Sequence, residues 1–430
     1  MAEIRPSLRG LHFSPTLLIN EEVARLRAEG REVYHMGFGE SPFPVHPIIQ
    51  ERIGGYAGRN QYLPAAGLAS LRKQAQRYII DRHGIENEDF IPVIGPGSKE
   101  LIFDIQLAVE GDLLFPVPSW VSYIPQTLIT RDEVVKIRLG PERAYKLDGP
   151  TLDEAIRTAR DHGRNPRKLI LNYPNNPTGM SYTDTELAQI ADVCRDNDIL
   201  VISDEIYARV SFGAYHHSIA RYYPEGTIVT TGLSKHLSLG GFRLGVALVP
   251  AGMERIFEVI RAIASETFSA VSTPIQYAVM AAFEEYPEIE GYIQQCTTIH
   301  RSMTMRLWMV LQRLGLDYGE PSGAFYLYPD FEPYRERFHE WYGVSTSADL
   351  AARILERESV ATLPGSAFGE EPDRLRLRLS TVDFNGARAL EAARSGEWQE
   401  NDEFYARTFP RSHEALVRLE RFCTDPGGDR

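Results

Sequence analysis

The feature that most constrains the fold of this chain is an alternation of short apolar runs with helix-length amphipathic stretches. It extends from about residue 90 to 250. The run "KLILN" ends in the turn "YPNNPTG", and the stretch that follows, 183–199, predicts a helix. Thr183 and Glu186 form a capping-box pattern at its start, and apolar residues recur at helical spacing on one face. The next run, "ILVIS", predicts a strand buried on both faces. This alternation indicates an α/β fold with a parallel sheet and crossover helices.

Composition argues against several classes of function. The chain has 430 residues, 43% of them hydrophobic, and a formal net charge of −13 without any block of Lys and Arg. A nucleic-acid partner is not expected, because phosphate backbones bind concentrated basic surfaces. No membrane partner is expected either, since no apolar run approaches the ~20 residues of a membrane helix and the first residues lack a signal-peptide core.

The cysteines indicate a reducing compartment. Cys194, Cys296 and Cys423 lie far apart and lack CxxC spacing, so neither a disulfide framework nor a zinc site is indicated. We therefore expect a cytoplasmic protein without a bound metal.

The pattern of elements predicts two domains. Residues 49–300 would form a large domain, in which helices cover both faces of the mostly parallel sheet. Beyond residue 300, a long helix and short strands such as "GAFYLYP" and "RLRLRLS" predict a smaller α+β domain over 301–430. Residues 1–48 would be an N-terminal arm that also contributes to this small domain.

Polar residues follow apolar runs at four places, and these places predict a ligand site, because ligands of open parallel sheets lie beyond the carboxyl ends of the strands. In "IPVIGPGSKELIFDI", Gly97, Ser98 and Lys99 begin a helix whose free N–H groups suit a phosphate. Considered singly, each place also has a purely structural explanation: a glycine turn, an asparagine turn, a helix cap or a surface lysine. The other three places hold Asn176, the pair Asp204 and Tyr207, and Lys235.

Together these residue types match the chemistry of one cofactor. A phosphate cradle, an aspartate for a ring nitrogen, an asparagine and a tyrosine for a phenolic oxygen and a lysine for a Schiff base predict a pyridoxal phosphate site. The chain resembles the fold-type I pyridoxal-phosphate enzymes of the class I/II, aspartate-aminotransferase-like family. The resemblance runs from about residue 35 to 381 through motifs in the family's order, namely "GFGESPF", "QYLPAAGLASLR", "GPGSKEL", "PSW", "NYPNNPTG", "SDEIY", "SKHLSLGGFRLG", "GAFY", "LPGSAFG" and "RLS".

The resemblance implies a fold, an activity and catalytic residues. The fold is the pyridoxal-phosphate-dependent transferase fold, and the activity is ping-pong transfer of an amino group from an L-amino acid to a 2-oxo acid. Lys235 would form the Schiff base and carry the proton during catalysis. Asp204 would keep the pyridine nitrogen protonated, and Asn176 and Tyr207 would bind the phenolic oxygen.

The remaining cofactor contacts are implied in the same way. Trp120 would stack on the cofactor ring, and Tyr62 would reach the phosphate from a neighbouring subunit, which implies a homodimer with shared active sites. The phosphate would be held by Gly97, Ser98, Lys99, Ser234 and Arg243.

Substrate binding is expected at Arg378. Its position directly before "LS" matches the arginine with which the family binds the substrate α-carboxylate, and Arg376 is the alternative in the same alternating run. Asn176 would also contact the substrate. Gly39 would lie where the N-terminal segment passes over the substrate, too close for a side chain.

Three features depart from the family or leave alternatives open. Gly232 stands where many members carry a phosphate-binding serine, so Thr231 or Ser234 would replace that contact. The stretch 385–411 is longer and more polar than expected and has no assigned role. The segment "SKHLSLGGFRLG" is also similar to ACC synthases, which leaves a lyase or decarboxylase-like reaction as the alternative.

Two further classes are disfavoured, and the substrate stays undetermined. A non-catalytic regulator of this fold would carry a DNA-binding module before "GFGESPF", and too few residues precede that motif to form one. A nicotinamide dehydrogenase would carry a strand-linked GxGxxG early in the chain, and this sequence has none there. The identity of the amino acid and of the oxo acid does not follow from the sequence.

Overall fold

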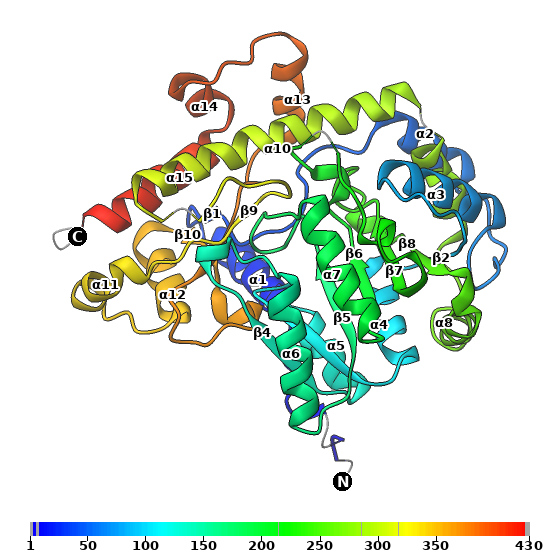
Figure 1. Cartoon of the computed structure of the whole chain (residues 1–430). Helices are drawn as coiled ribbons and strands as arrows, with labels where there is room; N and C mark the ends of the chain where they lie inside the picture. Colours follow the sequence, from blue (N-terminus) through cyan, green and yellow to red (C-terminus); the bar gives the residue numbers. More distant parts are fainter. Residues whose placement is uncertain (1–2, 6–7, 214, 285, 317, 426–430) are drawn as a thin grey trace.

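A seven-stranded sheet forms the centre of the molecule in this computed structural model (Figure 1). The structure describes residues 3–5, 8–213, 215–284, 286–316 and 318–425. The strand order is β2-β8-β7-β6-β5-β3-β4, and only β8 runs antiparallel to its neighbours. The predicted mostly parallel α/β sheet is therefore confirmed. Its strands are β2 (Phe90–Gly95), β3 (Asp112–Val117), β4 (Val134–Arg138), β5 (Pro166–Asn172), β6 (Leu200–Asp204), β7 (Thr227–Gly232) and β8 (Gly245–Pro250).

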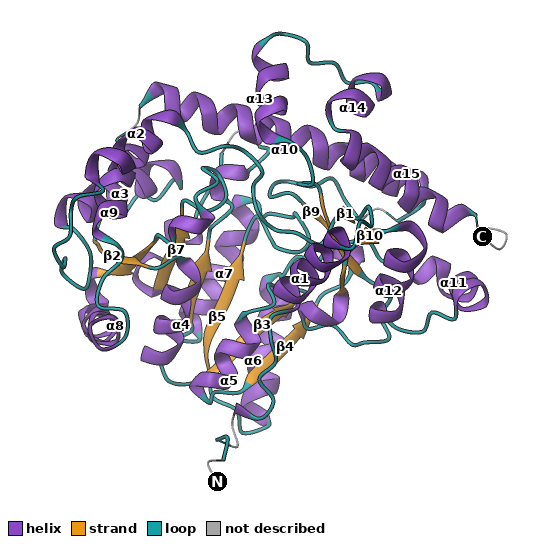
Figure 2. Cartoon of the chain, turned by 180° about the vertical axis from the view of Figure 1, so that it is seen from behind, coloured by secondary structure: helices purple, strands orange, loops and turns teal. Residues whose placement is uncertain are grey.

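Helices cover both faces of this sheet (Figures 1 and 2). Successive side chains of a strand point to opposite faces, so Ile170 and Ile202 pack with α4 and α8, whereas Leu169 and Val201 pack with α6 and α7. Helix α7 begins with the predicted capping box of Thr183. The helices of the two faces are α4 (Ser98–Ala108), α5 (Tyr123–Thr130) and α8 (Glu254–Glu266) on one, and α6 (Gly149–Asp161) and α7 (Asp184–Asp196) on the other.

Two small sheets form a second layer beside the large one. Strand β1 (Tyr34–His35) pairs in parallel with β10 (Val360–Ala361), which joins the N-terminal segment to the C-terminal part of the chain. A three-stranded antiparallel sheet has the order β11-β12-β9. The other elements of this layer are β9 (Tyr326–Leu327), β11 (Leu363–Pro364), β12 (Leu377–Ser380), α11 (Arg335–Tyr342), α12 (Ser347–Glu358) and α15 (Pro410–Thr424).

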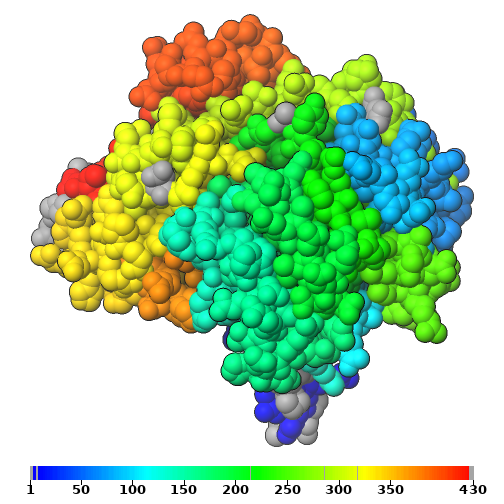
Figure 3. Space-filling view, viewed as in Figure 1, coloured from blue at the N-terminus to red at the C-terminus, as the bar shows by residue number. Residues whose placement is uncertain are grey.

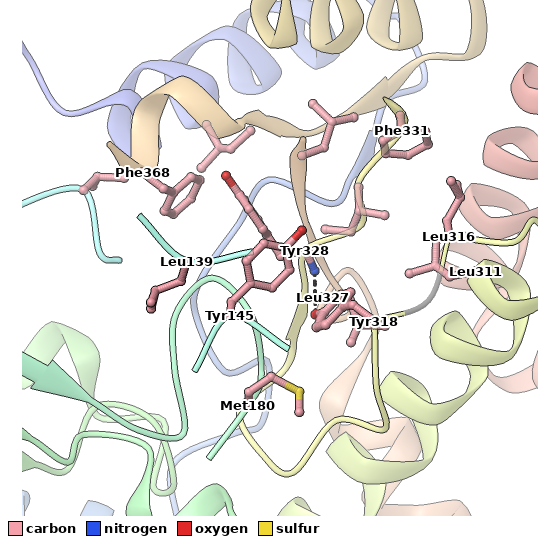
Figure 4. Close-up of a cluster of buried hydrophobic side chains, with 14 of the residues drawn as sticks. Leu139, Tyr145, Met180, Leu311, Leu316, Tyr318, Leu327, Tyr328, Phe331 and Phe368 are labelled. Carbon is pink, nitrogen blue, oxygen red and sulfur yellow. Dashed lines mark hydrogen bonds between the residues drawn. The ribbon is translucent and has the colours of Figure 1, made fainter. Parts of the chain in front are cut away.

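A continuous apolar core joins the two layers. Figure 4 shows Tyr145, from the connection after β4, against Tyr318 and Tyr328 of the second layer, with ring centroids 5.2 and 5.3 Å apart. The Tyr328 N–H donates to the Tyr318 hydroxyl at 2.8 Å. Because tightly packed interiors have few voids, this core fixes the second layer against the carboxyl edge of the sheet.

The remaining helices lie around these layers. The long helix α10 (Pro287–Arg313) passes along both layers, and α1 (Pro15–Ala28) lies beside the carboxyl ends of the central strands (Figures 1 and 2). In the described part of the chain, no helix combines the length and apolarity needed to cross a bilayer. The others are α2 (Pro47–Tyr56), α3 (Ala69–Arg82), α9 (Thr273–Ala278), α13 (Gly386–Arg394) and α14 (Asp402–Thr408).

A buried lysine at the start of β5 allows a test of this packing. The Nζ of Lys168, a residue with no exposed surface, donates to Val109 O and to Asp132 Oδ2, both at 2.7 Å. Removing one partner of a buried pair costs roughly 3–5 kcal/mol. We expect Lys168→Ala to lower the unfolding midpoint in urea strongly, and Lys73→Ala, at an exposed position of α3, to leave it nearly unchanged. Equal midpoints for both variants would contradict the packing described.

Candidate active site

A pocket of about 460 Å³ lies at the carboxyl ends of β5, β6 and β7, within the size range of small-molecule sites. Tyr62 does not reach it and is 92% exposed on this single chain. The other predicted site residues all line the pocket: Gly39, Gly97, Ser98, Lys99, Trp120, Asn176, Asp204, Tyr207, Ser234, Lys235, Arg243 and Arg378.

Lys235 lies just beyond the end of β7. Its Nζ donates to Gly39 O at 2.6 Å and lies 5.5 Å from the centroid of the Tyr207 ring. Burial lowers the pKa of Lys235 to about 8, and the positive charge of Arg378 acts in the same direction. A lysine with this pKa is partly unprotonated near neutral pH, which a nucleophilic amine requires.

Asp204 is the last residue of β6 and is buried. Its Oδ2 accepts a hydrogen bond of 2.5 Å from the Tyr123 hydroxyl, and its Oδ1 accepts one from the Ile206 N–H. Burial raises the pKa of Asp204 to about 6, although both hydrogen bonds act against the rise. The carboxylate is thus a stronger base than an exposed aspartate, and it lacks a cationic hydrogen-bond donor among the described residues.

The glycine turns at one end of the pocket leave backbone groups accessible. Gly97 has φ +96°, and a Cβ there would lie 2.5 Å from Arg243 Nη2. A Cβ on Gly245 would lie 2.4 Å from the backbone nitrogen of Ser98. Only glycine allows this close approach of the Arg243 guanidinium to the start of α4, and together they form a concave anion site.

The structure separates the two candidates for the substrate carboxylate. Arg376 is paired with Asp330 and Glu370 at 2.9 and 2.6 Å, outside the pocket. Arg378 is 1% exposed and lines the pocket, and its guanidinium donates to Gly37 O and to Asn176 Oδ1. In the described ranges Arg378 has no acidic partner, and its Nε has no hydrogen-bond acceptor. A buried, uncompensated guanidinium favours binding of a carboxylate.

The structure also distinguishes between the two replacements for the serine missing at Gly232. The Thr231 hydroxyl donates to Glu205 O at 3.2 Å and does not line the pocket. Ser234 does line it. Of the two, only Ser234 lies at the pocket, and the additional phosphate contact stays a prediction.

Behind Asp204, a buried hydrogen-bond network surrounds Glu205. His83 and His216 donate to its Oε2 at 2.6 and 2.9 Å, and Ser203, Ser218 and Tyr173 donate to its Oε1. Burial alone would raise the pKa of Glu205, but the hydrogen bonds from the two histidines lower it below its usual value. These three side chains could form a metal site by composition. Because the imidazole N–H groups already point at the carboxylate, a hydrogen-bond network describes them better.

Several pocket residues were not identified from the sequence. The hydroxyl of Tyr326 lies 2.8 Å from that of Tyr207, and the Arg378 guanidinium lies 4.6 Å from the centroid of the Tyr326 ring. Tyr326 belongs to the "GAFY" motif. Tyr123, which does not line the pocket but donates to Asp204, follows "PSW", so both were adjacent to recognised signals. No motif indicated the residues that α1 and the position before it contribute, which are Ser14, Thr16, Leu17 and Asn20.

Comparisons with known proteins identify the family. The model of the family "Aminotransferase class I and II" matches residues 36–392. The chain belongs to the class I and II aminotransferases. It is 32% identical to an aspartate aminotransferase of Geobacillus stearothermophilus, over 86% of this chain and 92% of that protein. It is 29% identical to an asparagine–oxo-acid transaminase of Streptococcus mutans, over 89% and 95% of the two chains.

Solved structures confirm the fold of this aminotransferase. The structure of a Thermus thermophilus aspartate aminotransferase with maleate matches with a TM-score of 0.83 at 24% identity, over 98% of this chain and all of that chain. The predicted transferase fold is therefore confirmed, and the family match and the relatives confirm the predicted aminotransferase activity. The comparisons give no support to the lyase alternative.

The residues of this aminotransferase fit pyridoxal phosphate, the cofactor of its family. Because Gly97 lacks a Cβ, the Arg243 guanidinium lies against the start of α4, where its charge and the first backbone N–H groups suit a phosphate. Asp204 offers a carboxylate with raised basicity, and Lys235 and Arg378 line the same pocket. The pocket thus provides an anion site, a base for a ring nitrogen and a reactive amine.

The pKa of Lys235 yields a prediction for covalent binding of the cofactor. The unprotonated amine attacks the aldehyde, so the rate at which apoenzyme binds pyridoxal phosphate covalently should rise with pH around a midpoint near 8. An ordinary lysine would give a midpoint near ~10.4. The rate is measured from the change in cofactor absorbance in a pH series.

Borohydride reduction and peptide mass mapping locate the adduct in the same experiment. We expect it on Lys235. An adduct on Lys99 or Lys168, or a rate that still rises steeply well above pH 9 as for an ordinary lysine (~10.4), would contradict the assignment.

Proposed function

We propose that this aminotransferase acts on a dicarboxylic amino acid, L-aspartate, and transfers its amino group to a 2-oxo acid. The observation that carries the proposal is a cation in the pocket, Lys99, in addition to Lys235, Arg243 and Arg378. Lys99 Nζ lies 5.1 Å from the centroid of the Trp120 ring, and none of the described acidic side chains forms an ion pair with it. Burial lowers the pKa of Lys99, and Arg243 adds to the effect, so a bound anion would be favoured there.

The two cations suit the two ends of such a substrate. Arg378 would bind the α-carboxylate through its planar fork, and Lys99 would bind the side-chain carboxylate as a point charge. The names of the relatives, aspartate aminotransferase and asparagine–oxo-acid transaminase, support a substrate of this size and polarity. Gly39 would lie over the substrate. A larger residue does not fit there, because a Cβ would lie 2.6 Å from the Tyr326 hydroxyl.

The cofactor would be held at both ends by residues of the pocket. Asp204 would bind the ring nitrogen, and Tyr207 with the Asn176 amide would bind the phenolic oxygen. Trp120 would stack on the cofactor ring, and its position in the wall of the pocket supports this role. The phosphate would be bound by the backbone of Gly97 and Lys99, by the hydroxyls of Ser98 and Ser234, and by Arg243.

Proton transfer would be the task of Lys235. Pyridoxal phosphate supplies, when bound, an electron sink for the bond broken at the substrate Cα. The Lys235 amine would remove the proton from Cα and return it on the cofactor side, and its pKa of about 8 suits both directions near neutral pH. Gly39 O, 2.6 Å away, would orient the amine.

Substitution of Lys99 tests the choice of substrate. A charge-assisted contact to a carboxylate is worth roughly 1.5–3 kcal/mol, so Lys99→Gln should lower kcat/KM for L-aspartate by about 10- to 100-fold. For L-alanine, which lacks the second carboxylate, the change should be small. Steady-state rates with a common 2-oxo acid measure both values, and Lys73→Gln on the exposed side of α3 is the matched control.

Single turnovers complete this experiment. Without a 2-oxo acid, wild-type enzyme and L-aspartate should give about one product equivalent per site and then stop, because the amino group stays on the cofactor. An equal loss of activity of Lys99→Gln toward both amino acids would refute the role of Lys99. Product that accumulates beyond the number of sites would indicate a lyase.

We also propose a cytoplasmic homodimer with shared sites. The exposure of Tyr62, 92% on a single chain, supports a contact with a partner subunit. The three cysteines are free and buried, which suits a reducing compartment. In such a dimer, Tyr62 would reach the phosphate bound by the other subunit.

Mixed dimers test the shared site. We expect the variants Tyr62→Ala and Lys235→Ala to have low activity when separate. After subunit exchange, one site of each mixed dimer would contain both native residues, so up to about half of the sites in mixed dimers should recover. The measurement is activity after mixing, with exchange verified by mass spectrometry. Exchange without recovery would show that Tyr62 acts within its own chain or not at all.

A further inference from the structure

The stretch 385–411, to which the sequence assigned no role, folds into α13, α14 and the start of α15, and α13 and α14 protrude above α10 (Figures 1 and 3). Its inner side is apolar: Phe404, Tyr405 and Phe409 are each at most 2% exposed. They belong to the same apolar cluster as Leu237 and Leu239, which lie two and four residues after Lys235. The stretch is therefore part of the core behind the active site, although its outer surface is polar.

The start of this stretch touches the segment that covers the substrate position. We call residues 39–43, the sequence "GESPF", the substrate loop. Gly386 is the first residue of α13, and a Cβ there would lie 2.3 Å from Pro42 O and 2.7 Å from Phe43 Cα. The ring of Phe384 packs edge-on against the ring of Phe43, with centroids 5.7 Å apart. No space separates the helix from the loop.

The substrate loop is held from its other side by pocket residues. Gly39 O accepts from Lys235, and the Gly39 Cα faces the Tyr326 hydroxyl so closely that a Cβ would lie 2.6 Å from it. Ser41 Oγ accepts a hydrogen bond of 2.8 Å from Ser238, three residues after the catalytic lysine. The loop thus lies between the pocket and α13 and contacts both.

A buried histidine links the loop to the same core. His300 on α10 is 1% exposed, its Nε2 lies 3.4 Å from Ser41 Oγ, and its ring packs edge-on against Phe43 at 5.0 Å. The ring of Phe384 contacts both members of this pair, with its centroid 6.4 Å from that of the His300 ring. These contacts leave the loop no space to withdraw from the pocket without displacing α13.

We propose that residues 384–386 are a positioning element that sets how deeply the substrate loop enters the active site, and thereby the affinity for the amino acid. Because close-packed interiors transmit displacements of a few tenths of an ångström, a shift of the Pro42 backbone caused by α13 also shifts the backbone at Gly39. This inference rests on the proposed binding of substrate beneath Gly39. The cofactor contacts at Ser98 and Arg243 lie away from α13 and should be insensitive to it.

Gly386→Ala tests the proposal directly. The added methyl must displace the backbone of Pro42 and Phe43, so we expect the dissociation constant of the amino acid to rise at least about fivefold. Backbone hydrogen exchange of a peptide covering residues 39–43 should become faster. Affinity for pyridoxal phosphate should change far less than affinity for the amino acid, because the phosphate contacts at Ser98 and Arg243 do not involve the substrate loop. The probe is whichever standard amino acid most strongly bleaches the cofactor absorbance of the wild type, so an error about L-aspartate does not affect the comparison.

Gly291→Ala is the matched control, because Gly291 is also helical and a Cβ there meets no atom within 4 Å. It should leave substrate affinity and loop exchange unchanged. If Gly386→Ala does not fold, Phe384→Leu removes the ring contact to Phe43. It should also raise the dissociation constant of the amino acid and speed hydrogen exchange of residues 39–43, but by less than Gly386→Ala. Wild-type substrate affinity in the folded variant, with or without a loss of thermal stability, would overturn the proposal.

Discussion

The hydrogen bonds to the buried Glu205 carboxylate hold together the chain segments that form the floor of the active site. An ionised carboxylate without exposure is costly unless each oxygen is saturated by donors, and here both oxygens are. Because Asp204 directly precedes Glu205, this anchoring fixes the carboxylate that faces the pocket. The donors come from separate segments, after α3 (His83), after β5 (Tyr173), within β6 (Ser203) and from the loop before β7 (His216 and Ser218).

The pocket has the opposite electrostatic character. Among the described residues, no acidic side chain forms an ion pair with Arg378, Lys235 or Lys99, although Glu40 and Asp204 also line the pocket, whereas the neighbouring Arg376 is neutralised by Asp330 and Glu370. Buried cations without ion pairs favour anions, and burial lowers the pKa of both lysines. Specificity for an amino acid with two carboxylates would follow from this charge distribution rather than from pocket shape.

Much of the site could be predicted because the sheet is parallel. The carboxyl ends of β5, β6 and β7 meet at one edge, so polar residues directly after each apolar run, such as Asn176, Asp204 and Lys235, had to lie close together. The capping box at Thr183 was readable because its hydrogen bonds are local. Tyr326 and the α1 residues were missed, because their approach to the pocket depends on the second layer packing against the first.

The sequence alone determined the alternation of strands and helices, the glycines of the phosphate turn and the order of the site motifs, since these depend on local hydrogen bonding and on the period of apolar residues. The alternating run by itself does not distinguish Arg376 from Arg378, because both lie on one face of it, and the choice of Arg378 rested on its position before "LS". Only the tertiary structure shows the physical difference between them, by placing two carboxylates beside Arg376 and the pocket beside Arg378. Likewise, the packing of Gly386 on Pro42 joins residues more than 300 positions apart, and no local pattern encodes such a contact.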